Sequence, residues 1–274
     1  MNVLISLFAL VLVILFFANI FSILFHLLRY IFGEFATSFV HFKPIKPSYK
    51  KALEQHFTYY KNLNENHKRS FEQRVQRFID LKTFVPRNFT EIPDEIKAIV
   101  AASAIQLTFG LPRVYLQHFS KILIYPDDYY SVIFRRYHQG EVNLHGGIIV
   151  LSWRNFARGY MDDADGRNLG LHEMAHALRL ENEINNGEYG FLNKSLLRKW
   201  RKEAEKTIEY LKNGGNGFFR DYAATNRDEF FAVAAENFFE RPNEFNDKFP
   251  ELYQLLTQLL RQDPILIKNS NKKL

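Results

Sequence analysis

The sequence has no cysteine among its 274 residues. This absence excludes thiolate nucleophiles, disulfide scaffolds, Cys-ligated zinc sites and iron–sulfur clusters. Any protein-bound metal must therefore be held by His, Asp or Glu. A hydrophobic fraction of 47% and a charged fraction of 24% also exclude a chain that is disordered throughout. The length suffices for one good-sized core or two modest ones.

The first 25 residues lack ionisable side chains, and 21 of them are apolar or aromatic. A stretch of this length exceeds the roughly 30 Å hydrocarbon core, whereas the apolar region of a secretory signal has only about 7 to 15 residues. A buried core helix is the alternative, but we predict a transmembrane anchor at residues 1–28. The basic residues that follow it predict a single-pass protein of the cytoplasmic membrane, with the remaining chain on the cytoplasmic side.

The net charge of +6 is concentrated outside the central part of the chain. A basic juxtamembrane linker at residues 29–50, together with the adjoining Lys51, and a basic, flexible tail at residues 266–274 carry the excess, which leaves the rest of the body near −1. A nearly neutral body argues against nucleic acid as a partner. We expect a single domain at residues 51–265.

Hydrophobic periodicity predicts an α+β domain that is mostly helical. Helical patterns cover residues 51–83, 94–109, 167–180, 194–213, 226–239 and 248–261. A small mid-chain β-sheet is predicted from strands at residues 121–125, 131–137 and 147–151, and the last of these is expected to be half-buried or at an edge.

His172, Glu173 and His176 form an H-E-x-x-H pattern within the predicted helix at residues 167–180. On a helix, residues i and i+4 lie on one face, so both imidazoles can bind one cation while the glutamate reaches a metal-bound water. A structural helix in which both His residues form only local hydrogen bonds is the alternative. The pattern favours a zinc site.

Two acidic residues, Glu229 and Glu236, lie two turns apart on one face of the predicted helix at residues 226–239. Acids on an otherwise apolar face need a partner such as a metal or a ligating His. Glu229 could instead be an ordinary first-turn carboxylate, and Glu236 could face solvent. Weaker candidates for a further ligand are Glu181, Glu183, His118, His138 and His145.

Several ordered segments of the chain resemble the Mlc titration factor A family of zinc peptidases, over about residues 71–264. The segments are residues 107–111, Ile-Leu-Ile-Tyr-Pro at 122–126, Gly-Ile-Ile-Val-Leu-Ser-Trp at 147–153, residues 168–178 with the H-E-x-x-H, and residues 221–242. The chain differs from the family at Arg179, where an acidic residue is usual, and in its apolar N-terminus.

The resemblance implies a zincin-like, gluzincin-type metallopeptidase in which His172, His176 and Glu229 bind Zn²⁺. It also implies that Glu173 is the general base for a zinc-bound water and that Tyr222 lies near the site, where its hydroxyl could stabilise an oxyanion. Glu236 is the candidate for an outer partner of the ligands.

The leading hypothesis is thus a membrane-anchored zinc peptidase that acts on a peptide or protein. The strand at residues 147–151 is expected to bind the extended substrate. The alternative is a membrane-tethered regulatory protein that uses zinc structurally and sequesters a cytoplasmic protein partner.

Overall fold

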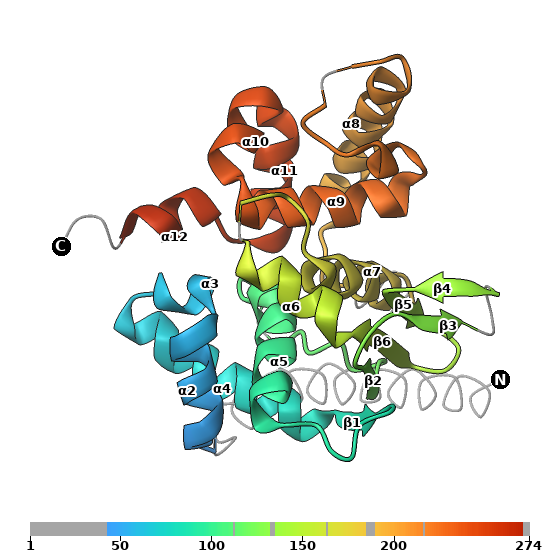
Figure 1. Cartoon of the computed structure of the whole chain (residues 1–274). Coiled ribbons are helices and arrows are strands. Elements are labelled where there is room, and N and C mark those ends of the chain that lie inside the picture. The colour runs from blue at the N-terminus through green and yellow to red at the C-terminus, as the bar shows by residue number, and fades with distance from the viewer. Residues whose placement is uncertain are drawn as a thin grey trace, which may run out of the picture. The chain divides into compact units, whose positions relative to one another are not determined.

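A computed structural model describes residues 43–111, 113–131, 135–162, 164–184, 190–215 and 217–270, in which a small sheet lies at one side of a larger group of helices (Figure 1). The first helices are α2 (Pro47–His56), α3 (Thr58–Lys61), α4 (Glu65–Leu81) and α5 (Asp94–Thr108). The later ones are α6 (Trp153–Met161), α7 (Leu169–Ile184), α8 (Lys194–Lys212), the 3-10 helix η1 (Asp221–Ala224), α9 (Arg227–Glu240), α10 (Pro242–Lys248), α11 (Pro250–Leu260) and α12 (Pro264–Ser270).

The main sheet has four strands in the order β1-β2-β6-β5. β1 (Thr83–Pro86), β2 (Lys121–Tyr125) and β6 (Ile148–Ser152) are parallel, and β5 (Gly140–Asn143) pairs antiparallel with β6. β3 (Tyr129–Ser131) and β4 (Arg136–His138) form a separate hairpin. The predicted α+β class, mostly helical with a small sheet, is confirmed.

Helix α5 lies at the centre of the fold because its sequence is rich in Ala and Ile, and twelve of its fifteen residues are buried. Helices α2, α4 and α7 pack against it. Helix α7 in turn lies between the sheet and α9 (Figure 1). Gly170 makes this packing possible, since a Cβ there would lie 2.6 Å from the Phe156 ring and 2.7 Å from Ser103 Oγ. The buried start of α7 is thereby fixed against α5 and α6.

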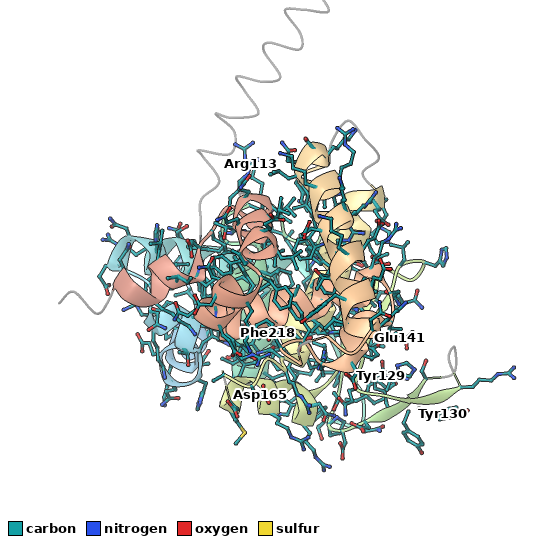
Figure 2. All side chains as sticks on the ribbon, turned by 90° about the horizontal axis from the view of Figure 1, so that it is seen from above. Arg113, Tyr129, Tyr130, Glu141, Asp165 and Phe218 are labelled. Atoms are coloured by element: carbon teal, nitrogen blue, oxygen red, sulfur yellow. The ribbon has the colours of Figure 1, made fainter. Side chains whose placement is uncertain are left out.

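The strand predictions were only partly correct. β6 is a central, largely buried strand that pairs with both β2 and β5, whereas we expected a strand that is half-buried or at an edge. The predicted strand at residues 131–137 is instead divided between the two strands of the β3–β4 hairpin, whose exposed Tyr130 points away from the body in Figure 2. The edge strand β5 was not predicted.

The predicted localisation in the cytoplasmic membrane is contradicted. Within the described part of the chain, no helix is long and apolar enough to cross a membrane. The physical reason is the composition of the described helices. A span needs about 20 predominantly apolar residues, and α8, which with 19 residues is long enough to approach this length, carries Lys, Arg and Glu throughout. The predicted anchor at residues 1–28 lies outside the described residues.

Candidate metal centre

Helix α7 carries both histidines of the H-E-x-x-H pattern. Its start is capped by Asn168, whose Oδ1 accepts a hydrogen bond from the Leu171 backbone N–H at 3.0 Å. His172 and Glu173 follow at once and are buried, with 7% and 6% of their surface exposed. The pattern therefore lies in the first half of a rigid, deeply packed helix.

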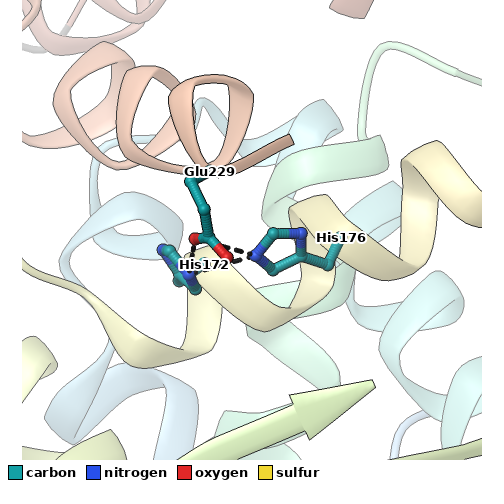
Figure 3. A group of neighbouring side chains, drawn as sticks. All are labelled: His172, His176 and Glu229. Carbon is teal, nitrogen blue, oxygen red and sulfur yellow. Dashed lines mark hydrogen bonds and ion pairs between the residues drawn. The ribbon is translucent and has the colours of Figure 1, made fainter. Parts of the chain in front are cut away.

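Helix α9 brings Glu229 to these histidines. Asn226 caps α9 by accepting hydrogen bonds from the backbone N–H groups of Asp228 and Glu229, both at 2.9 Å. Glu229 thus occupies the first turn, from which its side chain points down to α7 (Figure 3). A capping residue close to the ligand limits how far the carboxylate can move.

The three candidate ligand atoms form a small triangle (Figure 3). Glu229 Oε2 lies 3.2 Å from His172 Nε2 and 3.4 Å from His176 Nε2, and the two Nε2 atoms are 3.1 Å apart. Ligands held at about 2.0–2.1 Å by a tetrahedral zinc are separated by roughly 3.4 Å. The triangle therefore has the dimensions of three protein ligands around one zinc ion.

The chemistry of these groups also fits a cation. Glu229 Oε2 is buried yet makes no well-aligned hydrogen bond with any described residue. Burial opposes ionisation of Glu229, but its contacts with both imidazoles hold its pKa well below the usual range. Burial also opposes ionisation of His172, but its contacts with Glu229 and Glu236 outweigh this effect and raise the pKa of His172 to about 10. The carboxylates around the two imidazoles thus favour a positive charge between them.

A second set of contacts holds His172 from behind. Glu236 is fully buried, and its Oε1 lies 2.7 Å from His172 Nδ1 and 2.6 Å from the Arg220 guanidinium. Its Oε2 accepts a hydrogen bond from the Asn168 backbone N–H at 2.8 Å. Outer partners of this type orient a metal-binding imidazole and raise its basicity. The role of Arg220 beside Glu236 was not predicted from the sequence. The adjacent Phe218 and Phe219 are buried, and this aromatic pair could have indicated that the segment before Arg220 packs into the core.

Glu173 lies against strand β5 at Gly140. A Cβ at Gly140 would overlap the Glu173 carboxylate, so only glycine leaves room for this side chain. Burial raises the pKa of Glu173, as suits a group that takes up a proton. Gly140 was not singled out in the sequence because the group it accommodates is 33 positions away.

On the zinc peptidase activity that the sequence resemblance implies, we expect Gly140→Ala to lower kcat/KM for peptide hydrolysis by about 10²-fold while leaving zinc content unchanged. The added methyl displaces the Glu173 carboxylate, and a misplacement of about 1 Å can have this effect. Gly217→Ala is the matched control, because a Cβ there meets no atom within 4 Å. Hydrolysis rates together with zinc content test this, and an unaffected rate in Gly140→Ala would contradict the assigned position of Glu173.

A cleft runs on both sides of the three candidate ligands. A larger cavity of about 730 Å³ and a smaller one of about 340 Å³ share four lining residues, namely His138, Gly140, His172 and Glu173. The two cavities therefore meet at the metal centre. Strand β5, which is at the edge of the sheet among the described strands, contributes lining residues to both of them.

Tyr222 lies on the wall of the larger cavity. It belongs to η1, is 47% exposed, and its ring centre is 6.0 Å from that of His172. The phenol is thus beside the candidate metal centre and open to a bound substrate. Its role in stabilising an oxyanion stays a prediction.

The weaker ligand candidates have other contacts. Glu181 accepts hydrogen bonds from the backbone N–H groups of Gln117 and His118, at 2.9 and 3.3 Å. Glu183 pairs with Arg179, and His118 Nε2 lies 2.6 Å from Leu144 O. His138 lines both cavities and Glu183 lines the smaller one, but neither belongs to the ligand triangle.

Glu240 lies near the outer contacts of the site, where it accepts a hydrogen bond from Asn168 Nδ2 at 3.1 Å. Burial, followed by the neighbouring charges of Glu236 and Asp165, raises its pKa to about 8. Between pH 4.5 and 8 the folded state therefore holds a proton that the unfolded state has lost. This contribution to stability is complete below pH 4.5 and disappears as the pH rises through 8.

Glu240→Gln should therefore stabilise the protein more at pH 8.5 than at pH 5, by about 2 kcal/mol, since one pKa unit corresponds to about 1.4 kcal/mol. Urea unfolding at both pH values measures the difference. The control is Glu244→Gln, because Glu244 pairs with Lys248 and its pKa is lowered, so its carboxylate is ionised at both pH values and the effect of the substitution should hardly differ between them. An equal effect of Glu240→Gln at both pH values would refute the shifted pKa.

An H-E-x-x-H helix with a glutamate from a second helix is the ligand set of metal-dependent peptidases. The family model of the glucose-regulated metallo-peptidase M90 matches residues 36–261, and the chain belongs to this family. This membership implies a metal ion, and His172, His176 and Glu229 could hold it.

Curated relatives agree with this assignment. Mlc titration factor A of Salmonella arizonae is 31% identical over 210 residues, which cover 69% of this chain and 81% of that protein. The Escherichia coli protein of the same name is 30% identical over 211 residues, covering 69% and 77%. An uncharacterised protein of Synechocystis sp. is 26% identical over 269 residues, covering 91% and 98%. The resemblance to the Mlc titration factor A family is confirmed.

Proposed function

We propose that this protein is a zinc-dependent peptidase. The observation that carries the proposal is the triangle of His172, His176 and Glu229, with the buried carboxylate of Glu173 beside it in an open cleft. A purely structural zinc site is closed by four protein ligands, whereas three ligands and a cleft leave a position for water. Zn²⁺ bound there would lower the pKa of that water toward about 7 and polarise the substrate carbonyl.

The residues of the chain divide the remaining work. Glu173 takes the proton of the attacking water and passes it to the leaving amine. The Tyr222 hydroxyl donates a hydrogen bond to the carbonyl oxygen as negative charge develops there. Glu236 and Arg220 hold the His172 ring in place, so that the ligand does not rotate during the reaction.

The substrate binds to β5 in this proposal, and not to the strand expected from the sequence. β6 already pairs on both sides, whereas β5 pairs on one side only among the described strands and borders the cleft. An extended peptide can add there as an antiparallel fifth strand through main-chain hydrogen bonds. Gly140 brings that edge close to Glu173.

The proposal is tested with the purified full-length chain. We expect about one zinc per chain, and cleavage of a mixed peptide library that stops when a chelator removes the metal and resumes when zinc is restored. Mass spectrometry of the products identifies the bonds cleaved. A zinc-loaded protein that cleaves no peptide in the library would contradict the proposal.

A second candidate function is the binding of a regulatory protein, with zinc as a structural element. It is favoured by the name Mlc titration factor A, which the bacterial relatives carry. Affinity capture with the Glu173→Gln variant separates the two functions. A partner retained equally by the wild type and the variant favours binding, whereas a polypeptide retained only by the variant and cleaved by the wild type favours the peptidase.

A further inference from the structure

Two arginines lie together on one wall of the larger cavity. Arg158 is in the last turn of α6, and Arg167 directly precedes the cap of α7. Gly159 allows these segments to touch, since a Cβ there would lie 2.9 Å from Asn168 Cα and 3.1 Å from Arg167 O. Asn168 Nδ2 also donates a hydrogen bond to Gly159 O at 3.0 Å. The close approach places both cationic side chains on the same wall.

Neither of these arginines is neutralised by the described part of the chain. Arg158 and Arg167 form no ion pair with a described carboxylate, and both are exposed in the cavity. The third arginine of the cavity, Arg220, is already paired with the buried Glu236. Apart from Glu173, which lines both cavities, the remaining acid of the lining is Asp165, whose carboxylate accepts a hydrogen bond from the Arg167 backbone N–H at 2.8 Å. With Glu173 set aside, the lining of the larger cavity therefore carries one more positive than negative charge.

The smaller cavity on the other side of the metal centre has the opposite charge. Leaving aside Glu173 and the ligands, it is lined by Glu141, Glu183 and Asp228 against the single cation Arg179. Figure 2 shows Glu141 well apart from Asp165, which lines the larger cavity. The cleft is thus polarised, with a basic side and an acidic side.

The direction of a bound peptide follows from strand β5. Gln139 lines only the larger cavity, Gly140 lines both, and Val142 lines only the smaller one. β5 therefore runs from the basic side toward the acidic side. A peptide antiparallel to β5 runs the other way, so the residues that follow its scissile bond enter the basic cavity.

We propose that Arg158 and Arg167 form a carboxylate-binding subsite for the part of the substrate that follows the scissile bond. This inference rests on the proposed peptidase function. The guanidinium groups bind either an acidic side chain or a free chain terminus, because each presents a planar fork of N–H donors that matches a carboxylate. The subsite makes the protein selective for peptides with negative charge after the cleaved bond.

The test uses the full zinc-loaded chain and a set of internally quenched Ala-rich peptides. The peptides share one N-terminal half and differ in whether the C-terminal half carries Asp, Ala or Lys. We expect kcat/KM to be at least about 10-fold higher for the Asp peptides than for the Lys peptides, since hydrogen bonds to charged groups are the stronger ones. Each peptide is made with a free and with an amidated C-terminus, which separates the two sources of carboxylate.

The variants link this preference to the two arginines. Arg158→Gln combined with Arg167→Gln should abolish the preference for Asp over Lys. Arg154→Gln is the matched control, because Arg154 is also exposed on α6 but pairs with Asp127 and does not line the cavity. It should retain the preference and the basal rate on the Ala peptide.

Fluorescence anisotropy of the same peptide sequences, labelled with the fluorophore but without the quencher, measures their binding to the Glu173→Gln variant and does not need turnover. Hydrolysis of all peptides without a charge preference would overturn the subsite and leave the peptidase function standing. Preferential binding of Asp peptides without any hydrolysis would support the subsite and contradict the peptidase function. A preference that survives in the double variant would also overturn the subsite.

Discussion

Replacing Glu173 by glutamine is expected to lower kcat for peptide hydrolysis by about 10²–10⁴-fold, the usual contribution of a general base, without a change in zinc content. Glutamine has nearly the same shape and fits beside Gly140, but it cannot accept the proton of the attacking water. Zinc content by elemental analysis and kcat from a cleaved library peptide measure the two effects. Glu205→Gln serves as a control, since Glu205 lies on α8 and pairs with Arg227.

The outcome separates catalysis from metal binding. If Glu173→Gln hydrolyses peptides at the wild-type rate, the proton must be taken by another group, and the proposed mechanism is wrong. If the variant instead loses its zinc, Glu173 supports the metal directly, which its position beside Gly140 and outside the ligand triangle does not predict.

Glu229→Ala is expected to remove the bound zinc and with it all peptidase activity. The substitution leaves two imidazoles as protein ligands, whereas a catalytic zinc is held by three. Metal affinity should fall by more than the roughly 10- to 100-fold that follows loss of an outer partner. The loss of zinc affinity in Glu236→Gln should lie within this 10- to 100-fold range, because the substitution changes only the hydrogen-bonding support of His172.

The neighbouring Asp228→Ala is the matched control for this series. Asp228 lies beside Glu229 in the same first turn of α9 but is exposed and pairs with Arg179. It should keep stoichiometric zinc. Competition with a chromophoric chelator gives the affinities, and equal zinc affinity in Glu229→Ala and the wild type would exclude Glu229 as a ligand.

The metal centre was predictable where its chemistry depends on local spacing. His172 and His176 are one helical turn apart, so the sequence alone places both on one face of α7. The role of Glu229 could not be derived in this way, since its distance from α7 depends on how two helices pack. The resemblance to a known family supplied that residue, and the interatomic distances agree with it.

The cleft was much less predictable because it depends on non-local pairing. An apolar run such as residues 148–152 has the same pattern in a central strand as in a half-buried edge strand, and its neighbours β2 and β5 are set by the tertiary fold. The division of residues 131–137 between two strands involves a turn in which Arg135 has a φ of +52°. No glycine marks that turn.

Asn168 takes part in four contacts at once. It caps α7, binds Glu236 through its backbone, and reaches Glu240 and Gly159 through its side-chain amide. Formation of helix α7 and support of the metal ligand therefore depend on one residue. A cation that binds only the folded chain raises its stability by RT ln(1 + [M]/Kd), so chelation should lower the melting temperature. Removal of the metal would thus make the start of α7 a site of early local unfolding and proteolysis.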